Sequence, residues 1–340
     1  MGIVLVACGR ASAPPPSAAS ASRTTETPVI SQSPVGVAAV PAPREGAALA
    51  WDAKDQYLLM FGGAITGPDG ANLTPDDTWA WTNHAWKALR TPKSPPGRTF
   101  PAMAYDPIRQ QVVMFGGGSA NSDPFRNDTW TWDGIDWTQV QPTTSPQPGM
   151  YLRMVFDAKL RSLILVRQSN LPGDALETWS WSGLTWTRVA IGSGPSPRWF
   201  FGLGNEPFTS DAMLVGGYYG AEGDPNASKN DTWTWDQGAW SQKQTAGASP
   251  AGYVATALDE GRHQAVLFTA GTNETWTFDG SSWLKRSPAH GPQPLLAHVA
   301  LAYDPNVTEV FLFGGKTDSS PGTRYLNELW AWDGSDWIKA

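Results

Sequence analysis

Residues 128–137 read Asp-Thr-Trp-Thr-Trp-Asp-Gly-Ile-Asp-Trp, and this phrase decides the fold. Its first rings alternate with polar residues and an Asp-Gly pair follows, which predicts a strand, a tight turn and a second strand. The phrase recurs with constant internal spacing along the whole chain. The ring residues of its six copies are Trp79/Trp81/Trp86, Trp130/Trp132/Trp137, Trp179/Trp181/Trp186, Trp233/Trp235/Trp240, Trp276/Phe278/Trp283 and Trp330/Trp332/Trp337.

The spacing of the copies predicts the architecture. Successive copies lie between 43 and 54 residues apart, the period of a four-stranded propeller blade. A repeat unit cannot bury its apolar face alone, so we interpret the rings as packing between blades and not as chemistry. The sequence therefore predicts an all-β protein, a six-bladed β-propeller of four-stranded antiparallel blades.

Each repeat contains the strands that this fold needs. An apolar run ends in a Gly-Gly pair in four repeats, as at Met60-Phe61-Gly62-Gly63. In all six repeats another strand ends ten residues before the Phe or Val that corresponds to Phe61. In the second repeat the four expected strands span 100–105, 111–115, 129–132 and 137–140. We expect blades at about 41–94, 95–145, 146–194, 195–248, 249–291 and 292–340, with residues 37–40 as a candidate strand to seal the ring.

These features resemble the kelch motif over residues 41–340. The Gly-Gly pair and an aromatic followed seven residues later by Trp carry the resemblance. Kelch-like domains are six- or seven-bladed propellers, and galactose oxidase and some sialic-acid mutarotases contain them. Galactose oxidase uses a copper site with a cysteine cross-linked to tyrosine, but residues 41–340 contain no cysteine and the four histidines lack metal-ligand spacing. We therefore predict no cofactor and no metal.

Composition narrows the partners. The net charge is −7, the pI is near 5.1, and no cluster of Lys and Arg occurs. We do not expect nucleic acid or an anionic membrane surface as a partner, because a protein that binds either one needs a positively charged surface patch. The expected partner is a protein or a glycan, bound by a monomer.

The first forty residues look like an anchor and a tether. Residues 5–8, Leu-Val-Ala-Cys, resemble the lipobox of a bacterial lipoprotein, which implies a signal remnant over 1–8 and a lipid on Cys8. Residues 9–40 are rich in Ala, Ser and Pro and predict a disordered tether. The expected location is the cell envelope outside the cytoplasm, the membrane being reached only through the lipid. A secreted protein, or a cytoplasmic one with an ordinary tail, is the alternative.

Two sets of residues are candidate ligand contacts. The loops between the second and third strands vary most in length, and variable loops on a rigid scaffold carry binding. They share a face with the connectors between blades, and their candidates are Phe125, Arg126, Tyr218, Tyr219, Arg324 and Tyr325. Five of six repeats also begin the innermost strand with a ring, which predicts an aromatic mouth to the central channel. Its candidates are Phe100, Tyr151, Phe200, Tyr253 and His298, with neighbouring Trp199; they either contact a ligand or plug the channel.

A carboxylate residue lies two positions before the first tryptophan of every copy. These residues are Asp77, Asp128, Glu177, Asp231, Glu274 and Glu328. A sixfold feature is not a unique catalytic pair, and we expect these groups to accept backbone N–H bonds of the incoming loop, with calcium binding as an alternative.

The sequence thus favours a surface-anchored binding module that recognises a protein or glycan through the long-loop face. No catalytic set such as Ser/His/Asp is evident. The alternative is a carbohydrate-active enzyme, mutarotase-like or oxidase-like, working at the channel mouth.

Overall fold

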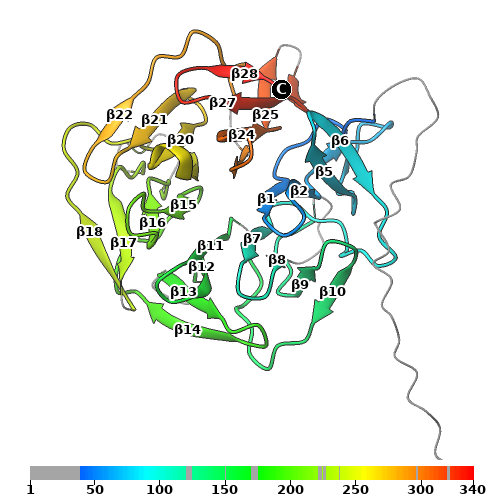
Figure 1. The fold of residues 1–340 in the computed structure, drawn as a ribbon, viewed down its shortest axis with the longest axis horizontal. Helices are drawn as coiled ribbons and strands as arrows, with labels where there is room; N and C mark the ends of the chain where they lie inside the picture. Colours follow the sequence, from blue (N-terminus) through cyan, green and yellow to red (C-terminus); the bar gives the residue numbers. More distant parts are fainter. Residues whose placement is uncertain are drawn as a thin grey trace, which may run out of the picture.

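Six four-stranded antiparallel sheets are arranged in a closed ring (Figure 1), and the cavities at its centre form a channel. The computed structural model describes residues 39–119, 125–149, 151–169, 175–220, 224, 227–236, 238–295, 298–319 and 322–340. Each sheet is built from one continuous stretch of the chain, so each is one blade. The architecture predicted from the repeats, an all-β six-bladed propeller, is confirmed.

The blades are built as follows. The first three contain β1 (Ala48–Asp52), β2 (Tyr57–Phe61), β5 (Thr78–Thr82) and β6 (Ala85–Leu89); β7 (Ala102–Asp106), β8 (Gln111–Phe115), β9 (Thr129–Trp132) and β10 (Trp137–Val140); and β11 (Arg153–Asp157), β12 (Ser162–Gln168), β13 (Leu176–Trp181) and β14 (Trp186–Ile191). The last three contain β15 (Gly202–Asn205), β16 (Ala212–Val215), β17 (Thr232–Asp236) and β18 (Ala239–Lys243); β19 (Val254–Asp259), β20 (Gln264–Thr269), β21 (Glu274–Phe278) and β22 (Trp283–Lys285); and β23 (Ala300–Asp304), β24 (Glu309–Phe313), β27 (Leu329–Trp332) and β28 (Trp337–Lys339).

Three small elements lie outside the blades. The hairpin β3 (Ile65–Thr66) and β4 (Asn72–Leu73) belongs to a loop of the first blade, and the hairpin β25 (Lys316–Ser319) and β26 (Gly322–Tyr325) to a loop of the sixth. One 3-10 turn covers Glu260–Arg262.

The first strand of each blade lines the channel. Each of these strands contacts the first strands of the two neighbouring blades; the six strands are β1, β7, β11, β15, β19 and β23. The second strands have apolar centres, since neighbouring blades cover both of their faces; in β8, for example, Val112, Val113, Met114 and Phe115 are all 0% exposed. Continuous burial on both faces explains why these segments lack the usual polar alternation.

The tryptophan phrase joins the blades. Its second and third rings stand opposite each other on adjacent strands, with centroids 5.5 Å apart for Trp132 and Trp137 and 4.9 Å for Trp181 and Trp186. The third indole also donates a hydrogen bond to a buried threonine of the preceding blade. The five bonds of this kind are Trp137 to Thr78 (3.0 Å), Trp186 to Thr129 (2.9 Å), Trp240 to Thr178 (2.8 Å), Trp283 to Thr232 (2.9 Å) and Trp337 to Thr275 (2.8 Å).

The Gly-Gly pairs follow from close packing. Gly62 has φ +67°, and a Cβ atom there would lie 2.4 Å from the carbonyl oxygen of Arg98 in the next blade. Gly63 donates its N–H to that same carbonyl at 2.9 Å. Only a residue without a side chain allows this approach and this backbone conformation together.

Ring closure uses side chains and loop hydrogen bonds. Leu49, Leu58 and Trp86 of the first blade share one apolar cluster with Phe311 and Phe313 of the sixth. The sealing strand expected at residues 37–40 is not supported: 37 and 38 lie outside the described residues, while Ala39 and Val40 are not in a strand and Val40 is 54% exposed. At this junction Leu329 takes the place that threonine holds elsewhere, so Trp86 packs there without the indole-to-threonine bond.

We expect Thr129→Val to destabilise the protein by about 1–3 kcal/mol, because it leaves the buried indole N–H of Trp186 without an acceptor. A double-mutant cycle with Trp186→Phe, followed by urea unfolding, measures the bond. A coupling energy of about 1 kcal/mol is the expected result.

Trp86→Phe is the matched control, since its neighbour Leu329 offers no acceptor. A loss of stability for Trp86→Phe as large as for Trp186→Phe would show that ring packing alone joins the blades.

Candidate functional site

Five rings converge over the channel and form what we name the aromatic lid: Phe100, Tyr151, Phe200, Tyr253 and His298. Ring centroids lie 4.6 Å apart for Phe100 and His298, 4.2 Å for Tyr151 and Phe200, and 4.5 Å for Phe200 and Tyr253. The sequence predicted that these rings circle the mouth, and the structure brings them together. They pack across the channel, so that the lid covers it.

The lid residues have an unusual backbone. Phe100, Tyr151, Phe200 and His298 have φ between +55° and +70°, a left-handed conformation that is uncommon for bulky residues and costs on the order of 1–3 kcal/mol each. The sixth repeat position is Gly46, whose Cβ would lie 2.5 Å from the Phe100 ring. Backbone bonds between blades hold this geometry: the Phe100 N–H donates to the Gly46 carbonyl at 2.7 Å.

An ion-paired cluster borders the lid between the sixth and first blades. His298 Nδ1 lies 2.5 Å from Glu45 Oε2, and Lys316 Nζ lies 3.4 Å from the same oxygen. Burial raises the pKa of Glu45, but the His298 hydrogen bond and charge and the Lys316 ammonium outweigh it and hold the pKa below its usual value. The Nε2 atom of His298 is buried and has no hydrogen-bond partner among the described residues.

A second aromatic group, the loop-face patch, consists of Trp199, Tyr218 and Tyr219. Trp199 is 36% exposed and its ring lies 5.1 Å from that of Tyr219. Trp199 and Tyr218 exchange backbone hydrogen bonds of 2.8 and 2.9 Å, which join a blade connector to a strand loop. The Tyr218 ring lies 5.5 Å from Tyr253 of the lid. The patch and the lid are therefore one continuous aromatic surface.

The other predicted loop residues are spread around the face. Phe125 is 45% exposed in the loop of the second blade. Tyr325 donates its hydroxyl to Asn72 Oδ1 at 3.2 Å and so joins the loops of the sixth and first blades. Arg126 and Arg324 lie near the carboxylates that precede their own tryptophan phrases. The structure thus brings Trp199, Tyr218 and Tyr219 together on the fourth blade and leaves the exposed Phe125 apart from them on the second.

The carboxylates before each phrase do not act as predicted. Their main partners are side chains and not backbone N–H groups: each accepts the indole N–H of the first tryptophan, as Asp128 does from Trp130 at 2.7 Å. Four of them also pair with a buried arginine. These pairs are Arg44 with Asp77, Arg98 with Asp128, Arg167 with Glu177, and Arg198 with Asp231. The pairs of Arg44, Arg98 and Arg198 are bidentate, and charge-assisted bonds of this kind are stronger than bonds from backbone N–H groups.

Metal binding finds no support in the described residues. They contain no group of three or more His, Cys, Asp or Glu side chains placed to hold an ion. No helix within the described ranges is long and apolar enough to cross a membrane. Cys8 lies outside the described residues.

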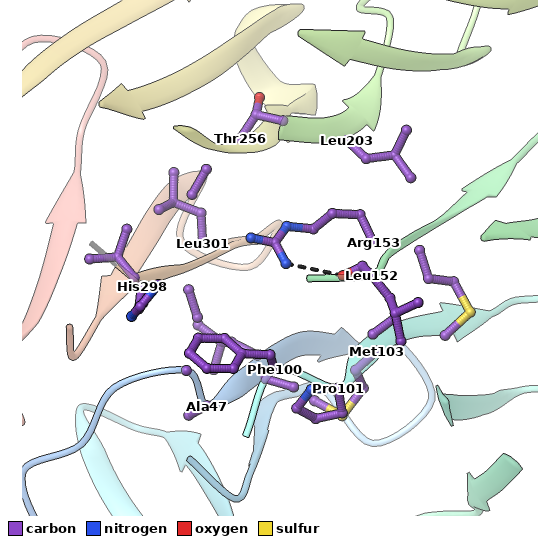
Figure 2. A pocket seen from close by; sticks show the side chains of 18 residues that line it. Ala47, Phe100, Pro101, Met103, Leu152, Arg153, Leu203, Thr256, His298 and Leu301 are labelled. Carbon is purple, nitrogen blue, oxygen red and sulfur yellow. Dashed lines mark hydrogen bonds between the residues drawn. The ribbon is translucent and has the colours of Figure 1, made fainter. Parts of the chain in front are cut away.

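A cavity lies directly beneath the lid. It has a volume of about 120 Å³, and Phe100 and His298 border it together with the starts of the six innermost strands. The Arg153 side chain extends from the third blade into its centre (Figure 2). The guanidinium donates a hydrogen bond to the Leu152 carbonyl at 3.0 Å.

Sequence reasoning missed Arg153, although the repeat contains the signal. Two residues after each lid position the chain has Ala48, Ala102, Arg153, Gly202, Ala255 and Ala300. Five small residues make room for one long cation. The search for histidine and cysteine motifs overlooked it, because a single arginine matches no catalytic motif.

Below this cavity lies a wider funnel of about 460 Å³ on the opposite face of the ring. We call this the short-turn face, because it carries the short turns between the first and second strands of the blades, which include Ala53, Pro107 and Ala158. Leu49, Met103, Met154, Leu203 and Leu301 border both spaces, so the two adjoin along the channel. The side chains at the open end are Trp51, Tyr105, Phe156, Asn205, Leu258 and Tyr303, and the turn residues around them are exposed. Sequence analysis had placed binding on the long-loop face alone.

The fold and this lidded channel define the chain as a six-bladed β-propeller. No protein-family model and no curated protein matches it by sequence. Solved structures do match in fold, at low identity. The structure of YjhT has a TM-score of 0.59 and 11% identity over 88% of this chain and 98% of that chain. A fucose-specific lectin from Aleuria aurantia has a TM-score of 0.53 and 14% identity, covering 88% and 96%.

Glu45→Gln is expected to make the free energy of unfolding fall less steeply as the pH is lowered. A carboxyl with a lowered folded pKa stabilises the fold above its unfolded pKa, here near 4.5, and this contribution is lost as the pH falls through the folded pKa. Urea unfolding at pH values from 7 to 3 measures the slope.

Glu260→Gln, at an exposed carboxyl on the short-turn face, is the control and should keep the wild-type slope. Identical profiles for the wild type and Glu45→Gln would contradict the assigned ion pair.

Proposed function

We propose that the protein is a kelch-like propeller that binds a glycan through its long-loop face. The observation that carries the proposal is the continuous aromatic surface made by the loop-face patch and the lid. Trp199 is exposed and its ring lies beside that of the half-buried Tyr219, and aromatic rings of this kind stack on the apolar face of a sugar ring. The fold likeness to a fucose-specific lectin adds support for carbohydrate as the ligand class.

The rigidity of the surface favours binding. Trp199 and Tyr218 are fixed by reciprocal backbone bonds, and the lid residues are fixed by packing and by hydrogen bonds between blades. A preorganised aromatic surface loses little conformational entropy on binding. The long loops then supply polar neighbours for sugar hydroxyl groups, as loops on a rigid scaffold commonly do.

An enzyme of the mutarotase kind is the second candidate, favoured by the paired Glu45 and His298 at the lid. General acid–base catalysis needs an imidazole nitrogen within hydrogen-bond reach of the substrate. The free Nε2 atom of His298 is buried among the lid rings. The exposed rings therefore support binding better than catalysis, and anomer exchange of free sugars followed by NMR tests the alternative directly.

A glycan array identifies the ligand. The double variant Trp199→Ala/Tyr219→Ala should lower the affinity for that glycan by about tenfold or more, because each stacked ring contributes on the order of 1 kcal/mol to the binding free energy. Isothermal titration of residues 41–340 gives the affinity, and the melting temperature should move little.

Phe208→Ala, which removes an exposed ring from the short-turn face, is the matched control and should bind as the wild type does. The proposal fails if the array shows no glycan while a pull-down recovers a peptide ligand, or if Phe208→Ala alone weakens binding.

We also propose that the propeller is held at the cell envelope outside the cytoplasm by a lipid on Cys8. The lipobox-like residues 5–8 and the Ala/Ser/Pro-rich segment after them support this. In a bacterial host, Cys8→Ser should move the protein from the membrane fraction to the soluble fraction. Acylation is checked by mass spectrometry, and an unchanged membrane fraction would contradict the anchor.

A further inference from the structure

The channel breaks the sixfold repeat at one position, and that position carries a charge. Where five blades have alanine or glycine, the third blade has Arg153, which extends across the lumen toward the fifth and sixth blades (Figure 2). Packing does not require this residue, because the same place in the other five blades is filled by a small one. A long cation in a lumen of small residues indicates a role other than blade packing.

Arg153, which is half-buried, differs in its partners from the four fully buried arginines. Arg44, Arg98, Arg167 and Arg198 each pair with a carboxylate. Among the described residues Arg153 has no such pair, and the cavity lining contains no carboxylate. Its single hydrogen bond, to the Leu152 carbonyl, uses one of five N–H donors. Burial lowers the pKa of Arg153 to about 10, so the side chain stays charged at neutral pH.

A charge held in a narrow channel without a counter-ion is costly. The lumen around Arg153 has room for a small group, about 120 Å³. The aromatic lid closes the space above it, so that access comes from the funnel on the short-turn face. Arg153 therefore sits at the blind end of a tunnel that is open at one side.

The lining of the tunnel sets the chemistry of its occupant. Between Arg153 and the open end lie Met103, Met154, Leu203 and Leu301, followed by the rings of Tyr105 and Phe156. Arg153 and Phe156 are three residues apart on one strand, which corresponds to a depth of roughly 10 Å. One cation at the end of an apolar tunnel matches one anionic group at the end of an apolar body.

We propose that the channel binds a monocarboxylic acid with an apolar body, its carboxylate on the Arg153 guanidinium and its body in the funnel. Guanidinium and carboxylate are planar and form two parallel hydrogen bonds. A monoanion neutralises the single charge, whereas a dianion such as phosphate or sulfate would bring an excess negative charge into the apolar lumen. This site is separate from the glycan surface, since the lid lies between them.

Octanoate is the probe, with octanamide as its uncharged analogue and acetate as the anion without a body. Isothermal titration and thermal unfolding of residues 41–340 measure binding. Octanoate should bind and raise the melting temperature, and octanamide and acetate should each bind at least about tenfold more weakly.

Arg153→Met should lower the affinity for octanoate by about tenfold or more. Arg153→Lys keeps the charge but not the planar guanidinium group, so its affinity should lie between those of Arg153→Met and the wild type. Without ligand, Arg153→Met should melt higher than the wild type, because an unpaired charge is removed. Arg188→Met, at an arginine on the outer strand β14, is the matched control and should leave octanoate binding unchanged.

Two further variants test the direction of entry. Ala158→Trp at the exposed rim of the funnel should obstruct octanoate, while Trp199→Ala on the long-loop face should not. The proposal is overturned if octanoate does not bind the wild type, if Arg153→Met binds it equally well, or if acetate binds as tightly as octanoate. Glycan binding that survives in Arg153→Met separates this result from that of the proposed function.

Discussion

The structure depends on the bond between one blade's third tryptophan and the preceding blade's threonine. The indole spans the gap between two sheets, and its N–H reaches a hydroxyl that is almost fully buried, as in Trp186 and Thr129. A buried indole without an acceptor is costly, so the bond fixes the position of one sheet against the next. Repeated at five junctions, it fixes the rotation from blade to blade.

The sixth junction shows what the bond adds to apolar packing. Between the sixth and first blades, Leu329 stands where threonine is found elsewhere, and the first and last blades of the ring meet there. Loop contacts are added at this junction: Arg44 and Leu326 share a backbone bond of 2.8 Å, and Tyr325 bonds to Asn72. The Glu45, His298 and Lys316 cluster lies at the same place. The junction without the repeated bond thus carries contacts of its own kind.

Rigid blades make the centre of the ring available for function. The innermost strands are held by their neighbours, and their side chains vary without changing the fold, which is why one blade tolerates Arg153. The connectors tolerate the left-handed backbone of Phe100 and Phe200 because hydrogen bonds between blades support it. The two faces differ as a result: rings cover the channel on one side, and a funnel enters it on the other.

The sequence by itself determined the repeat, the strand order and the packing role of the tryptophans. Spacing and alternation are local patterns that can be recognised directly in the linear sequence. It also placed the lid rings at equivalent positions. Only the tertiary structure decided that these rings meet across the channel, and that carboxylates such as Asp128 pair with indoles and guanidinium groups. It also decided that no carboxylate of the described residues lines the cavity around Arg153. These facts depend on distances between blades that are dozens of residues apart, and such distances are set by ring closure and not by local sequence.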